Sequence, residues 1–73
     1  MSTVQKPVVR FERGAMVYNG KNAHLLNVTG HPRLGDMPEV FTSRIESVDL
    51  GADGEVDRVV TLNTIYVREG VPL

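Results

Sequence analysis

The 73-residue chain contains no cysteine. Neither a disulfide nor a thiolate metal site can therefore support its core, and a cysteine nucleophile is excluded. Its two histidines, His24 and His31, do not have the spacing of a metal-ligand pair. Because a domain of this size buries only about 60% of the surface of its unfolded chain, its stability is marginal, and a second copy would help to bury more.

Long apolar runs and catalytic motifs are also missing. No stretch approaches the roughly 18–20 apolar residues of a membrane span, and Met1–Lys6 is too polar to begin a signal peptide, so we expect a cytoplasmic protein. The chain has no G-x-S-x-G motif, no glycine-rich phosphate loop and no serine beside a plausible base. We therefore expect a protein that is not an enzyme and that holds no metal or cofactor.

The net charge is only −1, but the charged residues are unevenly placed. Residues 1–33 hold five basic residues and one acid, 5 − 1 = +4, whereas residues 34–73 hold three arginines and eight acids, 3 − 8 = −5. The halves can neutralise each other within the fold or across a dimer, or the basic half can face an anionic ligand.

With 41% hydrophobic residues, the chain has the composition of a globular domain. We expect residues 1–6 to form a flexible tail and residues 7–73 a single β domain, because no window shows the 3.6-residue period of a helix. Val8–Arg13 is predicted to be a strand that Gly14 ends. Asn19-Gly20 predicts a tight hairpin between residues 15–18 and 21–28, since a type I′ turn needs positive φ at both central positions.

Residues 29–39 contain two glycines and two prolines. Because Pro32 and Pro38 lack the backbone N–H that a helix or central strand requires, we predict a long surface loop here, with at most one helical turn in residues 32–39. Loops of this length in small domains are usually binding loops or compact Ω-loops. His31 and Arg33 can present an imidazole and a guanidinium from this loop; alternatively, it is only a tight connection.

Two runs of β-branched residues, 40–49 and 59–67, flank a second turn signal at Asp53-Gly54. If Asp53-Gly54 is a two-residue turn, the numbers of opposed residues sum to 107, which places Arg44 beside Asn63 and Ser43 beside Thr64. Both faces of this hairpin mix apolar and polar residues, as expected for strands between two layers or between a core and a partner subunit. The predicted fold is all-β, with four or five strands in a small antiparallel meander or a partly open SH3-like barrel.

The predicted hairpin gathers polar side chains at its middle. A guanidinium beside an amide suits a carboxylate, a phosphate or a base edge, which makes Thr42, Arg44, Asn63 and Thr64 candidate ligand- or partner-binding residues together with His31 and Arg33. The alternative is a cross-strand ladder in which these side chains only hydrogen-bond to one another.

Residues 23–68 resemble short uncharacterised accessory proteins of tailed bacteriophages and prophages. The resemblance rests on Thr42-Ser43-Arg44, an acidic turn and Thr61-Leu62-Asn63-Thr64-Ile65-Tyr66, with lesser support from His31-Pro32. It implies a phage protein that acts in the bacterial host cytoplasm and binds a host or defence component. It names no target.

Three functions are compatible with these features. The first is a small binding protein, expected to be a homo-oligomer, that inhibits or sequesters a bacterial host protein or a nucleotide-like signal. The second is an SH3-like nucleic-acid-binding module that uses the basic residues Lys6, Arg10, Arg13, Lys21 and Arg33, with an affinity that falls steeply as salt rises. The third is a structural component of the virion.

Overall fold

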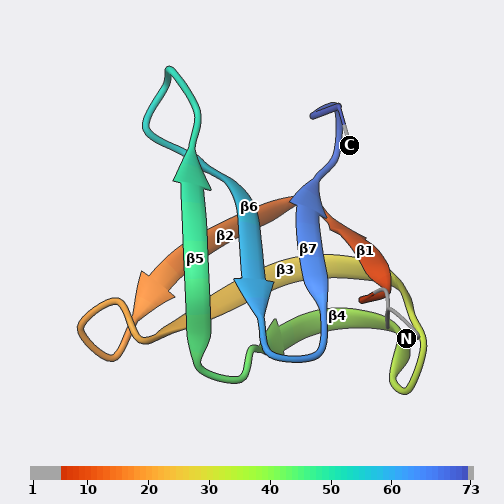
Figure 1. The fold of residues 1–73 in the computed structure, drawn as a ribbon. Helices are drawn as coiled ribbons and strands as arrows, with labels where there is room; N and C mark the ends of the chain where they lie inside the picture. Colours follow the sequence, from red (N-terminus) through yellow and green to blue (C-terminus); the bar gives the residue numbers. More distant parts are fainter. Residues whose placement is uncertain (1–5, 73) are drawn as a thin grey trace, which may run out of the picture.

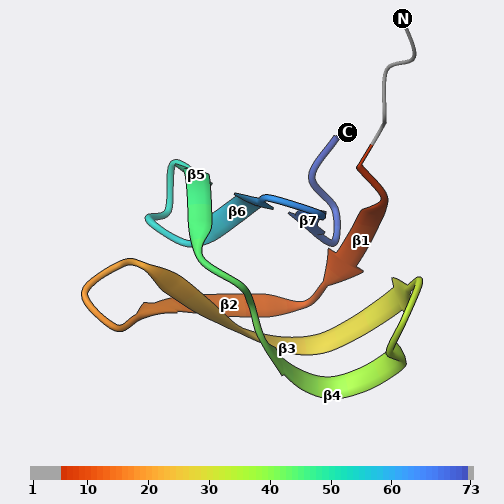
Figure 2. The ribbon, with the colours of Figure 1, turned by 60° about the horizontal axis from the view of Figure 1, so that its bottom comes forward.

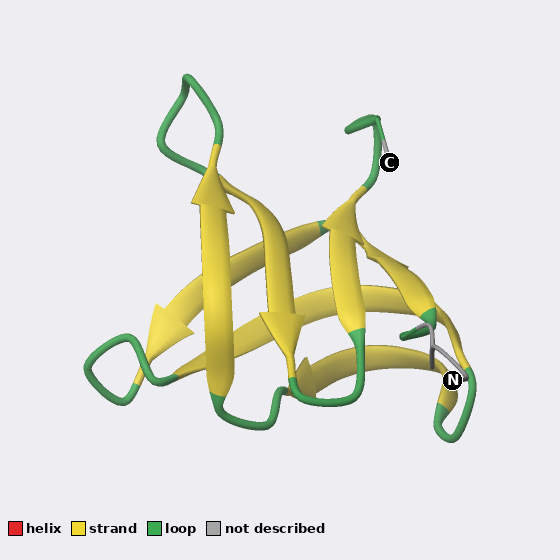
Figure 3. Cartoon of the chain, in the orientation of Figure 1, coloured by secondary structure: helices red, strands yellow, loops and turns green. Residues whose placement is uncertain are grey.

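The computed structural model describes residues 6–72. Its seven strands are β1 (Val8–Phe11), β2 (Arg13–Val17), β3 (Asn22–His31), β4 (Gly35–Phe41), β5 (Ile45–Leu50), β6 (Val56–Thr61) and β7 (Ile65–Arg68). Figures 1 and 3 show strands joined by turns, without a helix among the described residues. The predicted all-β class and the partly open SH3-like barrel are confirmed, although seven strands form where four or five were expected.

The strands form one curled sheet with the order β2-β3-β1-β7-β6-β5, and β4 also pairs with β3. All neighbours are antiparallel except β1 and β7, which are parallel. Figure 2 shows β5–β6–β7 as one layer and β2–β3–β4 as another, with β1 joining them at one side. The sheet is therefore a half-barrel of mixed strand direction rather than a purely antiparallel meander.

The curl begins where β3 bends. Arg10 of β1 opposes Thr29, and Arg13 of β2 opposes Leu26, so β1 and β2 follow β3 as one strand interrupted at Glu12. In the stretch of β3 between these pairs, Asn27 adopts the left-handed conformation with φ 53°, which is uncommon for a residue other than glycine. This bend lets one half of β3 stay with β2 while the other half follows β1 toward β7.

The core lies between the two layers. In β1 and in the first half of β3 the buried residues alternate with more exposed ones, as the period of two in a strand requires. The buried hydrophobic members of the core are Val9, Phe11, Ala23, Leu25, Val28, Val40, Val56, Val59 and Tyr66. No member of this set comes from β5, whose Ile45 and Val48 are only partly buried against it. The core thus occupies the closed side of the half-barrel, and β5 forms one of its edges.

The predicted long loop over residues 29–39 is wrong. β3 runs to His31 and β4 starts at Gly35, so the segment is a hairpin with a short turn. Proline excludes a central strand, but β4 is an edge strand that pairs only with β3, and an edge position tolerates the missing N–H of Pro38. Pro32 lies in the turn itself.

The predicted hairpin between residues 40–49 and 58–67 is correct only at its centre. Ser47, Val48 and Asp49 oppose Val60, Val59 and Arg58, and their numbers sum to 107. The sum becomes 106 at Leu50–Val56 and at Ile45–Thr61. Residues 40–41 instead belong to β4, which pairs with β3, and residues 62–64 turn the chain into β7.

The turn after β5 explains one of these shifts. The N–H of Gly54 donates to the carbonyl of Gly51 at 2.9 Å, and the N–H of Gly51 donates to Glu55 O at 2.8 Å. Gly54 has φ +80°, whereas Asp53 is not in the positive-φ region. This is a type I turn followed by a left-handed glycine, which adds one residue to the predicted two-residue turn.

The predicted turn at Asn19-Gly20 is confirmed. Both residues have positive φ, 58° and 80°, and Val17 opposes Asn22 at the end of the hairpin. Gly14, expected to end the first strand, instead lies within β2. A Cβ at Gly14 would stand 2.5 Å from Cδ2 of Leu25. The glycine is therefore a point of close approach between the backbone of β2 and the core.

We predict that Gly14→Ala lowers the free energy of unfolding by about 1–3 kcal/mol, the usual cost of overpacking a close-packed core. Leu25 is fully buried, so its side chain can shift only at the expense of its packing against other core residues. Urea unfolding of the wild type, Gly14→Ala, Leu25→Val and the double variant measures the coupling. Leu25→Val shortens the clashing side chain, so the double variant should be more stable than the two separate losses imply; additive losses would contradict the clash.

Candidate functional site

Thr42 of the predicted site is buried at the end of β4, with 5% of its surface exposed. Its hydroxyl accepts a hydrogen bond from the N–H of Ala23 at 3.0 Å and donates one to Ser43 O at 2.8 Å. Its carbonyl oxygen accepts from Asn22 Nδ2 at 2.8 Å. All of these groups serve the connection to β5, so Thr42 holds that connection in place and leaves no hydroxyl free for a ligand.

Thr64, also a predicted site residue, is 7% exposed, and Thr61 is 2% exposed. The Thr61 hydroxyl donates to Thr64 O at 3.1 Å and accepts from the Thr64 N–H at 3.2 Å. The Thr61 N–H also donates to Thr64 O at 2.9 Å. These bonds close a tight turn whose two tip residues, Leu62 and Asn63, are exposed.

The two clamped turns lie at the same end of the sheet, the lower end in Figure 1. Ile45 opposes Thr61, so Arg44, which precedes Ile45, and Leu62, which follows Thr61, both lie just beyond this pair. The N–H of Ile45 donates to Lys21 O at 2.7 Å, which brings the β2–β3 turn to the same place. We call five exposed residues of these three turns the strand-end surface: Lys21, Ser43, Arg44, Leu62 and Asn63.

Two predicted pairings are wrong. Arg44 does not oppose Asn63, and Ser43 does not oppose Thr64, because the strands on which they were placed end before them. Arg44 and Asn63 nevertheless come to the same end of the molecule, each in its own turn. The strand-end surface therefore gathers Arg44 and Asn63 by a different route from the one that the sequence suggested.

Lys6, near the N-terminus of the chain, contacts residues next to the strand-end surface. Its Nζ donates to Glu46 Oε1 at 2.8 Å and to Thr61 O at 2.9 Å. This ion pair joins the basic and acidic halves of the chain, as one of the two charge interpretations expected. The predicted flexible tail lies outside the described residues except for Lys6.

His31 and Arg33 lie at the β3–β4 turn, away from the strand-end surface. The His31 Nδ1 accepts hydrogen bonds from the backbone N–H groups of Arg33 and Leu34, both at 3.1 Å. The His31 ring centroid is 6.1 Å from that of Tyr66. His31 thus holds the turn in the way that a capping residue does, while Arg33 is exposed at its tip. The six predicted site residues are split between two places.

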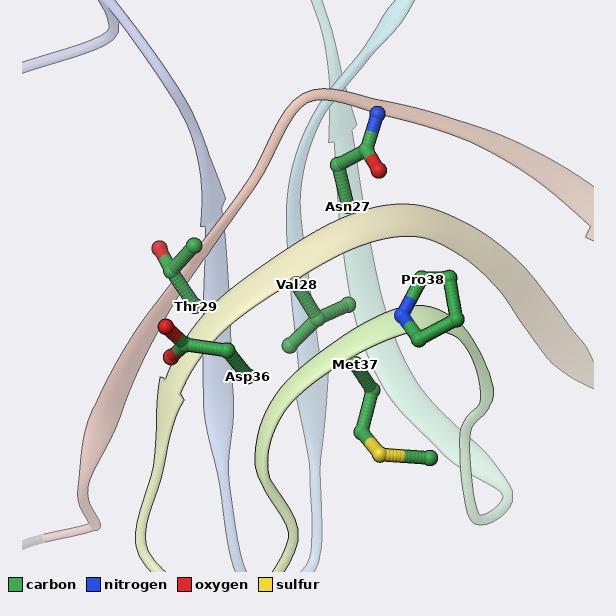
Figure 4. A pocket seen from close by; sticks show the side chains of 6 residues that line it. All are labelled: Asn27, Val28, Thr29, Asp36, Met37 and Pro38. Carbon is green, nitrogen blue, oxygen red and sulfur yellow. The ribbon is translucent and has the colours of Figure 1, made fainter.

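A shallow depression of about 310 Å³ lies where β3 bends. Figure 4 shows the six side chains around it: Asn27, Val28, Thr29, Asp36, Met37 and Pro38. The only ionisable residue in this lining is the acid Asp36, whose Oδ1 accepts from the Gly30 N–H at 2.9 Å. With a carboxylate and no cation in its lining, the depression is poorly suited to a phosphorylated ligand.

The structure also shows an exposed aromatic contact that the sequence did not indicate. The rings of His24 and Phe41 stack with centroids 4.3 Å apart and planes 5° apart, and His24 Nε2 lies 3.1 Å from Glu39 Oε2. Phe41 is 57% exposed. Sequence reasoning missed this group because it assigned residues 29–39 to a loop and Phe41 to the wrong hairpin.

Two acids near the β5–β6 turn, Asp53 and Asp57, form ion pairs with Arg68 of β7. Arg68 Nη2 lies 2.5 Å from Asp57 Oδ1, and its Nη1 lies 3.6 Å from Asp53 Oδ2. Burial lowers the pKa of Arg68, but the carboxylates, led by Asp57, raise it by more. The N–H of Glu55, donating to Asp53, is the main cause of the lowered pKa of Asp53.

Among residues 6–72, no cluster of three or more histidines and acids could hold a metal ion. The same part of the chain forms no helix of the length and apolarity needed to cross a membrane. Comparison of the chain with protein-family models, curated proteins and solved structures finds no significant match.

We predict that Thr61→Val lowers the free energy of unfolding by about 1–3 kcal/mol, because the buried N–H of Thr64 loses an acceptor while the shape of the side chain is kept. Urea unfolding measures this loss. Thr29→Val, at an exposed position on β3, is the matched control and should change stability by less than about 0.5 kcal/mol. Equal effects of the two substitutions would contradict a clamping role for Thr61.

Stability should also fall above about pH 10, because burial raises the pKa of Tyr66 above its ordinary value of 10.0 and the Thr64 side chain lowers it by less. The unfolded chain then loses its tyrosine proton at a lower pH than the folded one, so each rise in pH favours unfolding. Unfolding free energies between about pH 8 and about pH 11 measure this slope. The slope should shrink in Tyr66→Phe and persist in Tyr18→Phe; an unchanged slope in Tyr66→Phe would contradict the assignment.

Proposed function

We propose that this chain is a small non-catalytic binding protein of tailed-phage origin that inhibits or sequesters a bacterial host or defence protein in the host cytoplasm. The strand-end surface is its contact site. The observation that carries the proposal is the leucine at the tip of the β6–β7 turn: Leu62 is 67% exposed, in a turn that buried threonine hydroxyls hold rigid.

An apolar side chain displayed from a rigid turn favours a protein partner. A leucine side chain exposed to solvent adds nothing to the stability of the fold, whereas its burial in a partner's pocket contributes binding free energy. The hydrogen bonds that close the turn also lower the ordering cost of binding, because a turn that is already ordered loses less conformational freedom. A nucleotide would need a concave, cationic site, and the depression at the bend of β3 carries Asp36 instead.

The charges of the strand-end surface favour an acidic partner. Lys21 and Arg44 make no ion pair within the described residues, and both are exposed. Arginine can hold a carboxylate through two parallel hydrogen bonds. Nucleic acid is less well supported, because Lys6 is paired with Glu46 and Arg10 Nη1 donates to two carbonyl oxygens of the C-terminal segment.

The test is affinity purification of the tagged protein from its bacterial host, followed by titration of the partner that is recovered. Arg44→Ala and Leu62→Ala should each weaken binding about tenfold, equivalent to about 1.4 kcal/mol. Arg33→Ala/Leu34→Ala removes the same residue types from the tip of the β3–β4 turn and is the matched control. It should leave the affinity within about twofold, a change of less than about 0.5 kcal/mol.

Two outcomes would overturn the proposal. Loss of binding in the Arg33/Leu34 variant but not in the strand-end variants would move the site to the β3–β4 turn. A small phosphorylated species retained in native mass spectrometry, with no protein partner, would replace protein inhibition by sequestration of a nucleotide signal.

A further inference from the structure

The layer β2–β3–β4 has a second face that no other strand among residues 6–72 covers (Figure 2). In β3 the buried residues Ala23 and Leu25 alternate with His24 and Leu26, and in β4 the buried Val40 lies between two exposed residues. Figure 2 shows that β5–β6–β7 packs on only one side of this layer. We call the other side the outer face: Arg13, Ala15, His24, Leu26, Glu39 and Phe41.

The outer face is more apolar than a solvated sheet face usually is. Antiparallel sheets with one buried face normally place polar residues on the other. Here Phe41 is 57% exposed and Leu26 is 36% exposed. The Phe41 ring stacks on the ring of His24. The composition of the face therefore indicates that it is covered in the working protein.

The register orders these six residues in two rows across the strands. One row is Ala15–His24–Phe41 and the next is Arg13–Leu26–Glu39. The two ends of each row differ in character. The first row has the small Ala15 at one end and the large Phe41 at the other, and the second has the positive Arg13 at one end and the negative Glu39 at the other. Arg13 and Glu39 are two strand spacings apart, roughly 10 Å, so they do not pair within one copy.

We propose that a second copy of this chain covers the outer face, related to the first by a two-fold axis parallel to β3. Such an axis places β2 of each copy over β4 of the other, because it exchanges the two sides of β3 and keeps the rows in line. Arg13 then meets the partner's Glu39, and Phe41 lies over the partner's Ala15. The Leu26 side chains of the two copies meet at the axis.

The alternative two-fold axis, across the strands, does not give this match. It exchanges the two rows, so Phe41 would lie over the partner's Glu39 and Arg13 over the partner's Ala15. Arg13 would then be desolvated without an acidic partner, and Glu39 would keep only its contact with His24 of its own copy, which costs free energy. Charge and side-chain size therefore select the axis parallel to β3.

The size of the face limits the affinity. Three strands about 4.8 Å apart and three residues of about 3.4 Å each give a face of roughly 14 × 10 Å. This is smaller than the roughly 800 Å² per partner of a standard interface. The dimer should therefore be weak and should form only at high protein concentration.

Sedimentation velocity over a concentration series up to about 1 mM tests the proposal. Wild-type protein should shift from the 8.1 kDa monomer to a dimer of 2 × 8.1 kDa, about 16 kDa. Arg13→Glu and Glu39→Arg should each abolish the shift, because each places like charges opposite one another. The double variant restores both pairs with reversed polarity and should recover the dimer.

Control variants show whether dimerisation depends on the outer face or on another surface, including the strand-end surface. Arg33→Glu makes the same charge change at the β3–β4 turn and should leave the dimer intact, and circular dichroism establishes that each variant is folded. Arg44→Ala/Leu62→Ala should not change the mass, so failure of the dimer and failure of the proposed function are distinguishable. A wild type that stays monomeric throughout, or a double variant that does not recover the dimer, would overturn the inference.

Discussion

The fold depends on β3, which pairs with β1, β2 and β4. A straight strand could not serve all three, because β1 must also reach β7 in the other layer. The left-handed conformation of Asn27 resolves this by turning the second half of β3 away from β2. Every strand pairing that connects β2 or β4 to the other layer passes through β3, so the curl of the sheet depends on this bend.

The hydroxyl groups of two buried threonines hydrogen-bond to the backbone of turns. Thr42 directly follows β4 and Thr61 is the last residue of β6, and each uses its hydroxyl to satisfy backbone groups that a turn would otherwise leave unpaired. Of these two, only Thr42 was a candidate for ligand contact when only the order of residues in the chain was known. Their position makes them supports for a binding surface, and the neighbours that they expose are the residues able to touch a partner.

The sequence predicted what depends on short-range chemistry. The Asn19-Gly20 turn, the absence of helix and the all-β class all follow from local pattern, and the central register of β5 and β6 follows from turn position. The segments that failed depend on tertiary context. Whether Pro38 can lie in a strand depends on whether that strand is at an edge, and Phe41 pairs with His24 instead of Tyr66, although both arrangements fit the same alternation. Candidate residues Arg44 and Asn63 were recognisable by type, but their arrangement was not.

The parallel pairing of β1 with β7 has a consequence for folding. Val8 opposes Ile65, a separation of 65 − 8 = 57 residues, whereas the other strand pairs join closer parts of the chain. Contacts between distant residues must overcome a large loss of chain entropy before they contribute, which slows folding of β proteins to about milliseconds to seconds. The hairpins join neighbouring parts of the chain, whereas the half-barrel closes only when its first and last strands meet, so we expect this pairing to limit the rate of folding.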